Sequence, residues 1–150
     1  MIDEIDKKII NILQVNSRTS NAEIARILNM APSSVFERLK QLESKKIITG
    51  YSIKLNCEKL DCDQIAFIFI KTNERAGEIT VANKLSQIPE VQEIHHIAGE
   101  DCYLVKVRVK DNHALAKLMR EKIGVIDSIT STKTTIVLEA IKETTIIKLE

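Results

Sequence analysis

The chain has 150 residues, 44% hydrophobic content and a formal net charge of +1, which suits one domain or two small domains of roughly 60 to 90 residues. No apolar run approaches the ~20 residues needed to cross a bilayer and no basic-then-apolar leader follows Met1, so we expect a cytoplasmic protein. Cysteines at 57, 62 and 102 form no CxxC or otherwise pairable set, which fits a reducing compartment and argues against a zinc ribbon.

A first helix is predicted over residues 3–16. Asp3 suits the N-cap position and Asp6 lies in the first turn, where a carboxylate interacts well with the helix dipole. The apolar side chains that share one face are Ile5, Ile9, Ile12 and Leu13.

Residues 20–46 predict two short amphipathic helices separated by a tight turn. Ser20 and Glu23 have the spacing of a capping box. Asn29 tolerates the left-handed conformation that ends a helix, and Pro32 suits the first position of the next one. The side chains expected to face inward are Ile24, Ala25, Ile27 and Leu28, then Val35, Phe36, Leu39 and Leu42. Two helices joined in this way can place a recognition helix in the DNA major groove, and the alternative is a plain corner inside a helical domain.

Residues 47–55 leave the helical pattern and become extended and β-branched, and residues 56–64 are loop-like. We interpret the span as a hinge strand and linker. Because a strand outside a sheet has unpaired edges, we expect it to pair with the same strand of a second subunit.

After residue 64 the pattern becomes β-α-β-β-α-β. The expected elements are strands at 65–71, 91–98, 103–110 and 129–141, with helices at 78–88 and 112–123. A faint repeat relates residues 88–94 to 123–129, and two βαβ halves give a ferredoxin-like antiparallel sheet with both helices on one face. Its other face is expected to carry Ile, Val, Leu and Thr and to pack against another subunit.

The segment from Gly99 to Cys102 is either a loop that holds a small ligand or an ordinary hairpin, and spacing alone leaves both open. A metal site is not expected, since His95 and His96 point to opposite faces of a strand. Nothing marks a nucleophile–base pair around Cys102, and we therefore expect no enzyme, catalytic residue or cofactor.

Along essentially its whole length the sequence resembles the Lrp/AsnC (leucine-responsive, feast/famine) transcriptional regulators. The segments that carry the resemblance are 6–13, 18–25, 32–43, 47–51, 99–107 and 132–142. The resemblance implies an α+β protein with a three-helix, winged helix-turn-helix DNA-binding domain at 1–50 and a hinge strand and linker at 51–64. A ferredoxin-like βαββαβ domain for effector binding and oligomerisation would follow at 65–150.

The candidate site residues fall into two groups. The DNA-binding candidates are Arg18, Ser20, Asn21, Pro32, Ser33, Ser34, Glu37, Arg38, Lys40, Gln41 and Lys45. Of these, Ser33, Ser34, Glu37 and Gln41 are expected at base edges, and Arg18, Arg38, Lys40 and Lys45 at phosphates. The effector-binding candidates implied by the resemblance are His96, Gly99, Glu100, Asp101, Cys102, Tyr103, Thr132, Thr134 and Thr135.

The sequence departs from the family pattern at two positions. Cys102 stands where the family often has an acidic residue, and the second acid is one position earlier, at Asp101. Ala31 replaces the serine that usually caps the recognition helix, at a cost of ~1 kcal/mol unless Ser33 or Ser34 compensates.

These observations predict a sequence-specific regulator that binds double-stranded DNA as a homodimer, further assembled to a tetramer or octamer. An amino-acid-like effector would modulate its assembly or DNA affinity. The alternative is an amino-acid-sensing module that docks on another protein without binding DNA.

Overall fold

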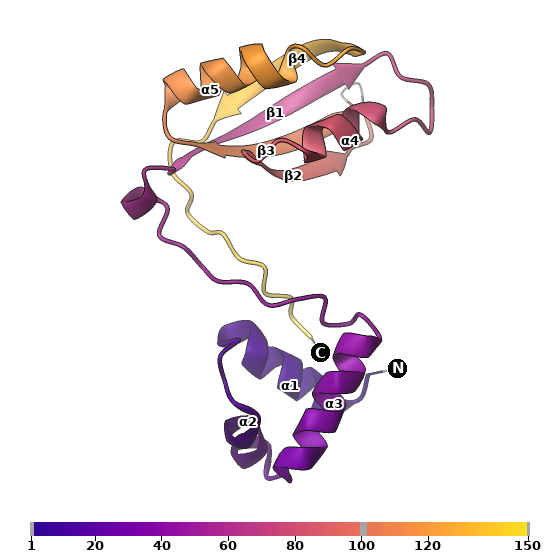
Figure 1. The fold of residues 1–150 in the computed structure, drawn as a ribbon, viewed down its shortest axis with the longest axis vertical. Coiled ribbons are helices and arrows are strands. Elements are labelled where there is room, and N and C mark those ends of the chain that lie inside the picture. Colours follow the sequence, from indigo (N-terminus) through magenta and orange to yellow (C-terminus); the bar gives the residue numbers. More distant parts are fainter. Residues whose placement is uncertain (1, 100–101, 150) are drawn as a thin grey trace. The chain divides into compact units, whose positions relative to one another are not determined.

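The structure is a computed structural model, and it describes residues 2–99 and 102–149. Contacts divide the chain into two compact units (Figure 1). The helical unit comprises Met1–Lys54 together with Lys142–Glu150, and the sheet unit comprises Leu55–Ile141. The return of the C-terminal segment to the helical unit was not predicted. The backbone of this segment makes two hydrogen bonds with the side chain of Gln14 in the first helix. The Ile147 N–H donates to Gln14 Oε1 (2.7 Å), and Gln14 Nε2 donates to the Ile147 carbonyl (3.0 Å).

Three helices form the described part of the helical unit: α1 (Glu4–Val15), α2 (Asn21–Leu28) and α3 (Pro32–Ser44). Asp3 caps α1 and shares a complete capping box with Asp6. At α2 only half of the predicted box is present in the described chain: Ser20 Oγ accepts from the Glu23 N–H (3.2 Å), and the Glu23 carboxylate makes no return bond to the Ser20 N–H. Asn29 ends α2 in the left-handed conformation, as predicted.

The core of the helical unit is narrower than the sequence pattern suggested. Its buried side chains are Ile9, Leu13, Ile24, Ala25, Val35, Leu39 and Leu42. Ile27 and Phe36, both predicted to face inward, are 53% and 56% exposed. Three short helices cover only a central stripe of one another, so apolar residues at the margin of each stripe stay in contact with solvent.

Residues 47–55 belong to no strand within the described chain, and their pairing with a second subunit stays a prediction. A strand is defined by its ladder of hydrogen bonds, and the described residues of this chain supply no partner ladder here. Tyr51, Ile53 and Leu55 are 52%, 80% and 60% exposed. A single 3₁₀ turn, η1 (Glu58–Leu60), interrupts the predicted loop that follows.

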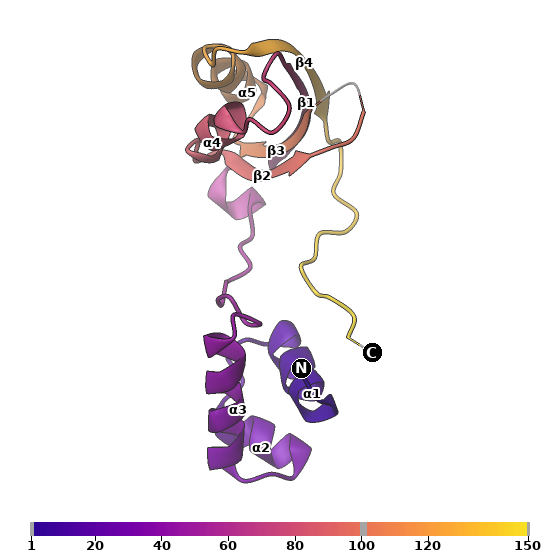
Figure 2. The same cartoon turned by 90° about the vertical axis from the view of Figure 1, so that its right-hand side faces the viewer.

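The sheet unit has the predicted β-α-β-β-α-β order. Its elements are β1 (Gln64–Thr72), α4 (Thr80–Ser86), β2 (Val91–His96), β3 (Tyr103–Val109), α5 (Asn112–Leu118) with a π turn η2 (Met119–Ile123), and β4 (Ile129–Ile136). In the described chain the strands form one antiparallel sheet in the order β2-β3-β1-β4, which confirms the ferredoxin-like topology. Both helices cover the same face of the sheet (Figure 2).

Several predicted boundaries in the sheet unit are wrong, and β2 and α4 each end two residues early, at His96 and Ser86. The last strand ends at Ile136 and does not reach residue 141. The helix predicted from residue 78 begins at Thr80, and Ile79, expected to face inward, is 57% exposed. Alternation of apolar residues marks where a strand or helix lies, while hydrogen-bond partners decide where it stops.

The open face of the sheet is less aliphatic than predicted. Most Ile and Val side chains of β1 and β3 point into the core, which includes Ile68, Ile70, Val105 and Val107. The opposite face carries half-buried Phe67, Phe69 and Leu104 among charged groups. Lys106 is paired with Glu93 (3.3 Å), and Lys133 Nζ lies 5.6 Å from the centre of the Phe69 ring. Packing of this face against another subunit stays a prediction.

Candidate functional site

Helix α3 presents a polar face that points away from the core of the helical unit. Ser33, Glu37, Lys40 and Gln41 are all exposed, while Val35, Leu39 and Leu42 are buried on the other side. The two sets separate because residues three to four positions apart share one face of a helix. We call Ser33, Glu37, Lys40 and Gln41 the recognition face.

The start of α3 lacks a side-chain cap. Ala31 occupies the N-cap position with no side-chain hydrogen bond, and Pro32 occupies the first turn as predicted. Ser33 is exposed and Ser34 is half-buried, and in the described structure neither supplies the missing cap. Both hydroxyls therefore stay available for an external partner.

Arg38 is engaged within the chain. Its Nη1 donates to Asp3 Oδ2 (2.7 Å) and to Asp6 Oδ1 (2.8 Å), and so joins α3 to the first turn of α1. A hydrogen bond from the Asp6 backbone, together with the bond from Arg38, lowers the pKa of Asp3. The hydrogen bond to Asp3 and, to a smaller extent, the hydrogen bond to Asp6 raise the pKa of Arg38. A phosphate would have to compete with these two carboxylates for the guanidinium, and the phosphate role of Arg38 stays a prediction.

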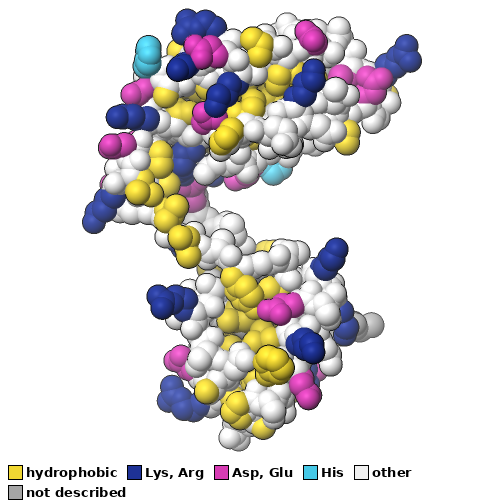
Figure 3. All heavy atoms as spheres, viewed as in Figure 1, with side chains coloured by type: hydrophobic (Ala, Val, Ile, Leu, Met, Phe, Trp, Pro, Cys, Tyr) yellow, Lys and Arg dark blue, Asp and Glu magenta, His cyan; other side chains and the backbone are white. Residues whose placement is uncertain are grey.

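The remaining basic candidates, Arg18 and Lys45, are exposed. The Arg18 N–H donates to Asn16 Oδ1 (3.0 Å), which fixes the backbone just before α2 while leaving the side chain in solvent. Ser20 uses its hydroxyl as the cap of α2, and Asn21 is half-buried in the first turn. In Figure 3, Lys and Arg side chains are interspersed with Asp and Glu over the visible surface, so any attraction for an anion is local.

Sequence reasoning missed the contact that holds the end of α3. Tyr51 donates from its hydroxyl to Glu43 Oε1 (2.8 Å), which fastens the segment after α3 to the last turn of that helix. Partial desolvation of this half-exposed side chain, together with the bond to a carboxylate, raises the pKa of Tyr51 to about 12. Sequence spacing gives no signal for the pair, because the chain reverses between the two residues.

The effector candidates do not converge on one place within the described chain. His96 and Tyr103 are cross-strand partners, and their ring centres are 5.3 Å apart. Gly99 is exposed with φ of +138°, a conformation that favours glycine. Cys102 accepts a hydrogen bond at Sγ from Thr72 Oγ1 (3.5 Å). Glu100 and Asp101 lie outside the described residues.

The three threonines of β4 divide between the two faces of the sheet. Thr132 and Thr134 pair with Ile70 and Ile68, whose side chains enter the core, so these threonines lie on the helix side. Thr135 pairs with Phe67 on the open face. Strand β1 lies between β4 and β3 and separates all three threonines from Tyr103.

Glu74 is a half-buried carboxylate that sequence reasoning did not single out. Its Oε1 accepts from the Val81 N–H (2.8 Å) in the first turn of α4, and its Oε2 is buried without a hydrogen-bond partner among the described atoms. Burial, with a further effect of the Glu74 charge, raises the pKa of Tyr103. Glu74 therefore lies close enough to Tyr103 to influence the ionisation of its hydroxyl.

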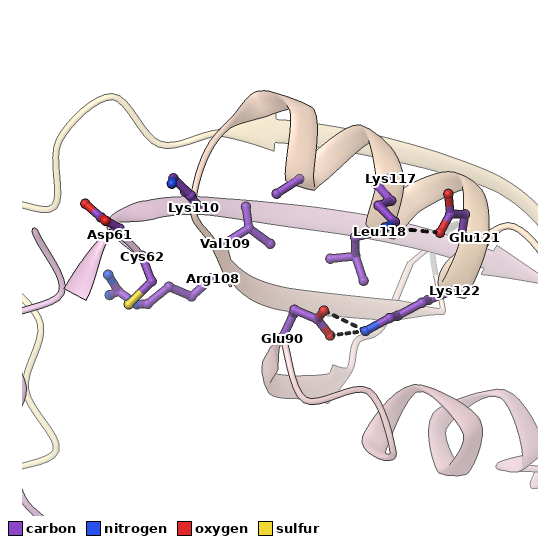
Figure 4. A pocket seen from close by; sticks show the side chains of 11 residues that line it. Asp61, Cys62, Glu90, Arg108, Val109, Lys110, Lys117, Leu118, Glu121 and Lys122 are labelled. Carbon is purple, nitrogen blue, oxygen red and sulfur yellow. Dashed lines mark hydrogen bonds and ion pairs between the residues drawn. The ribbon is translucent and has the colours of Figure 1, made fainter.

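A separate hollow of about 420 Å³ lies beside the last residues of β3, at the opposite end of that strand from Tyr103 (Figure 4). Its wall includes Cys62, Arg108 and Lys110, and Lys122 crosses it to pair with Glu90 (2.6 Å). The described effector candidates are not among its lining residues. The residues that the structure describes contain no cluster of three metal-ligating side chains and no helix that could span a membrane.

Comparisons with protein families match both units. A model described as winged helix-turn-helix DNA-binding matches residues 2–49, and one described as Lrp/AsnC ligand binding domain matches residues 65–147.

Relatives and solved structures agree over nearly the full length. The HTH-type transcriptional regulator FL11 of Pyrococcus furiosus is 37% identical over 97% of this chain and 95% of its own. The leucine-responsive regulatory protein of Escherichia coli is 33% identical over 95% of this chain and 88% of its own. The structure of Escherichia coli AsnC covers 97% of this chain and 98% of its own with a TM-score of 0.89 and 32% identity. The structure of a Neisseria meningitidis transcriptional regulator in complex with L-Met covers 99% of this chain and 97% of its own, with a TM-score of 0.92 and 28% identity.

Proposed function

This chain belongs to the Lrp/AsnC family of helix-turn-helix transcriptional regulators, and from that premise we infer that it binds double-stranded DNA through the recognition face of α3. The observation that carries the proposal is that face itself, which is polar and exposed, while the opposite side of α3 is buried in the core of the helical unit. A second copy of the chain would place a second α3 one helical turn away, on a pseudo-palindromic site. As a regulator acting on DNA, the protein is assigned to the cytoplasm and given no enzymatic role.

Within this proposal the polar residues of α3 contact base edges. Ser33, Glu37 and Gln41 have hydroxyl, carboxylate and amide groups that can pair with bases in the major groove. Ser34 lies beside them and is half-buried. Phe36, more than half exposed, adds an apolar surface of the kind that contacts a thymine methyl group.

The phosphate contacts are assigned to Lys40, Lys45 and Arg18, whose side chains are exposed. Ser20, Asn21 and Pro32 lie at the helix starts, where backbone N–H groups face an approaching phosphate. Arg38 receives a different primary task, because both of its carboxylate partners belong to α1. It holds α3 at a fixed angle to α1 and so positions the recognition face.

Lys40→Ala tests the phosphate assignment. DNA binding should weaken on every sequence, and the slope of log K against log salt should fall by about 0.9 for each lost contact. Lys59→Ala, an exposed lysine on η1, is the matched control and should leave the slope unchanged. Equal slopes for wild type and Lys40→Ala would remove Lys40 from the phosphate contacts.

An amino acid or a related small molecule is the proposed effector. Support comes from the match to a ligand-binding domain and from the similar regulator solved with L-Met. The candidates His96, Gly99, Cys102 and Tyr103 gather at one end of β3, while Thr132, Thr134 and Thr135 lie across β1. Because one chain does not close a pocket around both groups, we propose that a second subunit completes it, and that the effector shifts the assembly by differential affinity.

A thermal-shift panel of L-amino acids tests this assignment. A true effector at 100 times its Kd should stabilise the protein by ~2.7 kcal/mol. Thr132→Val and Thr135→Val form a matched pair on opposite faces of β4, and Thr132→Val is expected to weaken the response more because it shares the helix side with His96. A panel without any stabilising member would argue against an amino-acid effector.

Docking on another protein without DNA is not favoured. Relatives that span nearly the whole chain are named as transcriptional regulators, and the N-terminal match is to a DNA-binding model. Retention of a DNA fragment in a gel-shift assay separates the two possibilities. The docking alternative would gain support only if the purified protein ignored DNA even at low salt.

A further inference from the structure

Two cysteines that the sequence spacing left unpaired are brought together by the turn before β1. Cys57 and Cys62 flank η1 (Glu58–Leu60), and both are free thiols that are half-buried. The expectation that the cysteines form no pairable set depended on spacing alone, and the turn brings the backbones of these two close together. Four residues separate them in sequence, and only the fold of the turn reverses the chain between them.

The turn closes with the hydrogen bonds of a Schellman motif. The Cys62 N–H donates to the Cys57 carbonyl (3.0 Å), and the Asp61 N–H donates to the Glu58 carbonyl (3.3 Å). Asp61 lies in the left-handed region with φ of 52°, as the motif requires. In this motif the first and last side chains commonly touch, and here those side chains are Cys57 and Cys62.

The backbone geometry suits a disulfide. With an N···O distance of 3.0 Å between Cys62 and Cys57, standard bond lengths hold the two Cα atoms within roughly 7 Å. A disulfide spans roughly 4.4–6.8 Å between Cα atoms, so the bond needs little backbone movement. The Cys57 thiol donates to the Leu55 carbonyl (3.9 Å), and the proximity of Cys57 contributes to the raised pKa of the Cys62 thiol.

From this juxtaposition we propose that Cys57 and Cys62 form a reversible intrachain disulfide, a redox modification site in the segment between the recognition helix and the sheet. The site is separate from the recognition face and from the effector candidates, so the inference goes beyond the proposed function and does not depend on it. In a reducing compartment a disulfide of this kind is transient and responds to the thiol redox state.

The reaction uses a low-molecular-weight disulfide such as oxidised glutathione as the oxidant. The thiolate of one cysteine attacks a sulfur of the reagent and releases one glutathione thiolate, which takes up a proton. The second cysteine then attacks the mixed disulfide and releases the other glutathione. Two protein thiols are oxidised to one disulfide, and one reagent disulfide is reduced to two thiols.

The surroundings of the pair affect the rate. Burial, together with the neighbouring Cys57, raises the pKa of the Cys62 thiol, while the Arg108 guanidinium beside it works in the opposite direction (Figure 4). Since the thiolate is the nucleophile, the exchange should accelerate as the pH rises. A thiol with a raised pKa is also a poorer leaving group, so the disulfide should be reduced slowly once formed.

The test is a redox titration of the full chain in glutathione buffers, followed by alkylation and mass spectrometry. Free thiols should fall from three to one per chain, with Cys102 as the remaining thiol. After denaturation, trypsin cuts at Lys54, Lys59 and Lys71, and the peptides 55–59 and 60–71 should be joined. A non-reducing gel should show the oxidised protein at the position of a single chain.

Cys102→Ser is the matched control, since Cys102 is equally half-buried and touches Thr72 but no cysteine in the described structure. This variant should form the Cys57–Cys62 bond at the same redox poise as wild type. Cys62→Ser should stop at a mixed disulfide between Cys57 and glutathione. The proposal is overturned if wild-type Cys57 and Cys62 both end as glutathione adducts, if they link only between chains, or if both stay alkylatable where Cys102 is oxidised.

Discussion

Replacement of Ile24 by alanine should unfold the helical unit selectively. Ile24 is fully buried at the centre of α2, whereas Ile27, three positions along the same helix, is 53% exposed. The two residues have the same side chain in the same helix and differ in burial. The pair therefore isolates the contribution of the small helical core.

The expected magnitude follows from the atoms removed. Ile→Ala deletes three carbon atoms, worth ~0.8 kcal/mol each on transfer from water, and the cavity that remains adds to this, which gives ~2–5 kcal/mol. A unit of about 60 residues has a free energy of unfolding of ~3–9 kcal/mol. Ile24→Ala should therefore consume much of the stability of the helical unit. Ile27→Ala should cost less than ~1 kcal/mol, since its side chain is largely in water and alanine favours the helix.

Urea denaturation monitored by circular dichroism and by amide hydrogen exchange provides the assay. For Ile24→Ala, amides of α1, α2 and α3 should lose protection at low urea while those of β1 and β3 keep the wild-type midpoint. DNA binding should fall with the helical transition. Equal costs for Ile24→Ala and Ile27→Ala would refute the assigned core, and equal loss in both units would refute their independence.

Three further changes test individual contacts. Arg38→Ala should weaken DNA binding without altering the salt slope, because its carboxylate partners lie on α1, and a smaller slope would make Arg38 a phosphate contact. Between the ordinary tyrosine pKa of 10.0 and the raised value of about 12, the unfolded chain loses the Tyr51 proton while the native state keeps it, so the wild-type protein should lose stability as the pH rises. Tyr51→Phe should abolish this loss. Unchanged alkaline unfolding curves would contradict that assignment. Lys122 lowers the pKa of Glu90, so the ion pair stabilises the native state above the ordinary pKa of 4.5. This stabilisation is lost as the pH falls through the lowered pKa, and Glu90→Gln should therefore flatten the loss of stability in acid. Identical acid titrations of wild type and variant would argue against this ion pair.

Residue type and local spacing were sufficient to predict the helix caps and the alternation of buried and exposed side chains along β3. Asp3, Asn29 and Pro32 act at helix ends through their own side chains or backbone preferences, so their roles follow from residue type and position. The buried face of β3, Tyr103 to Val109, follows from a strict period of two. These features need no knowledge of distant neighbours.

Features that depend on distant neighbours were predicted less well. Ile27, Phe36 and Ile79 have the right spacing for burial and are exposed, since the elements that would cover them are too short. Arg38 belongs by sequence to the recognition helix, yet its charge is directed at α1. The effector candidates lie close in the family pattern and are divided between strands and faces in one chain.

By itself the sequence determined the order of helices and strands, the polar side of the recognition helix and the resemblance that names the family. These depend on periodicity and capping, which act over a few residues. Tertiary structure alone decided that Cys57 lies near Cys62, that Gln14 holds the backbone of Ile147, and that the buried Oε2 atom belongs to a Glu74 close to Tyr103. Each of these contacts requires the chain to reverse or return, and the free energy of that return comes from burial elsewhere in the molecule.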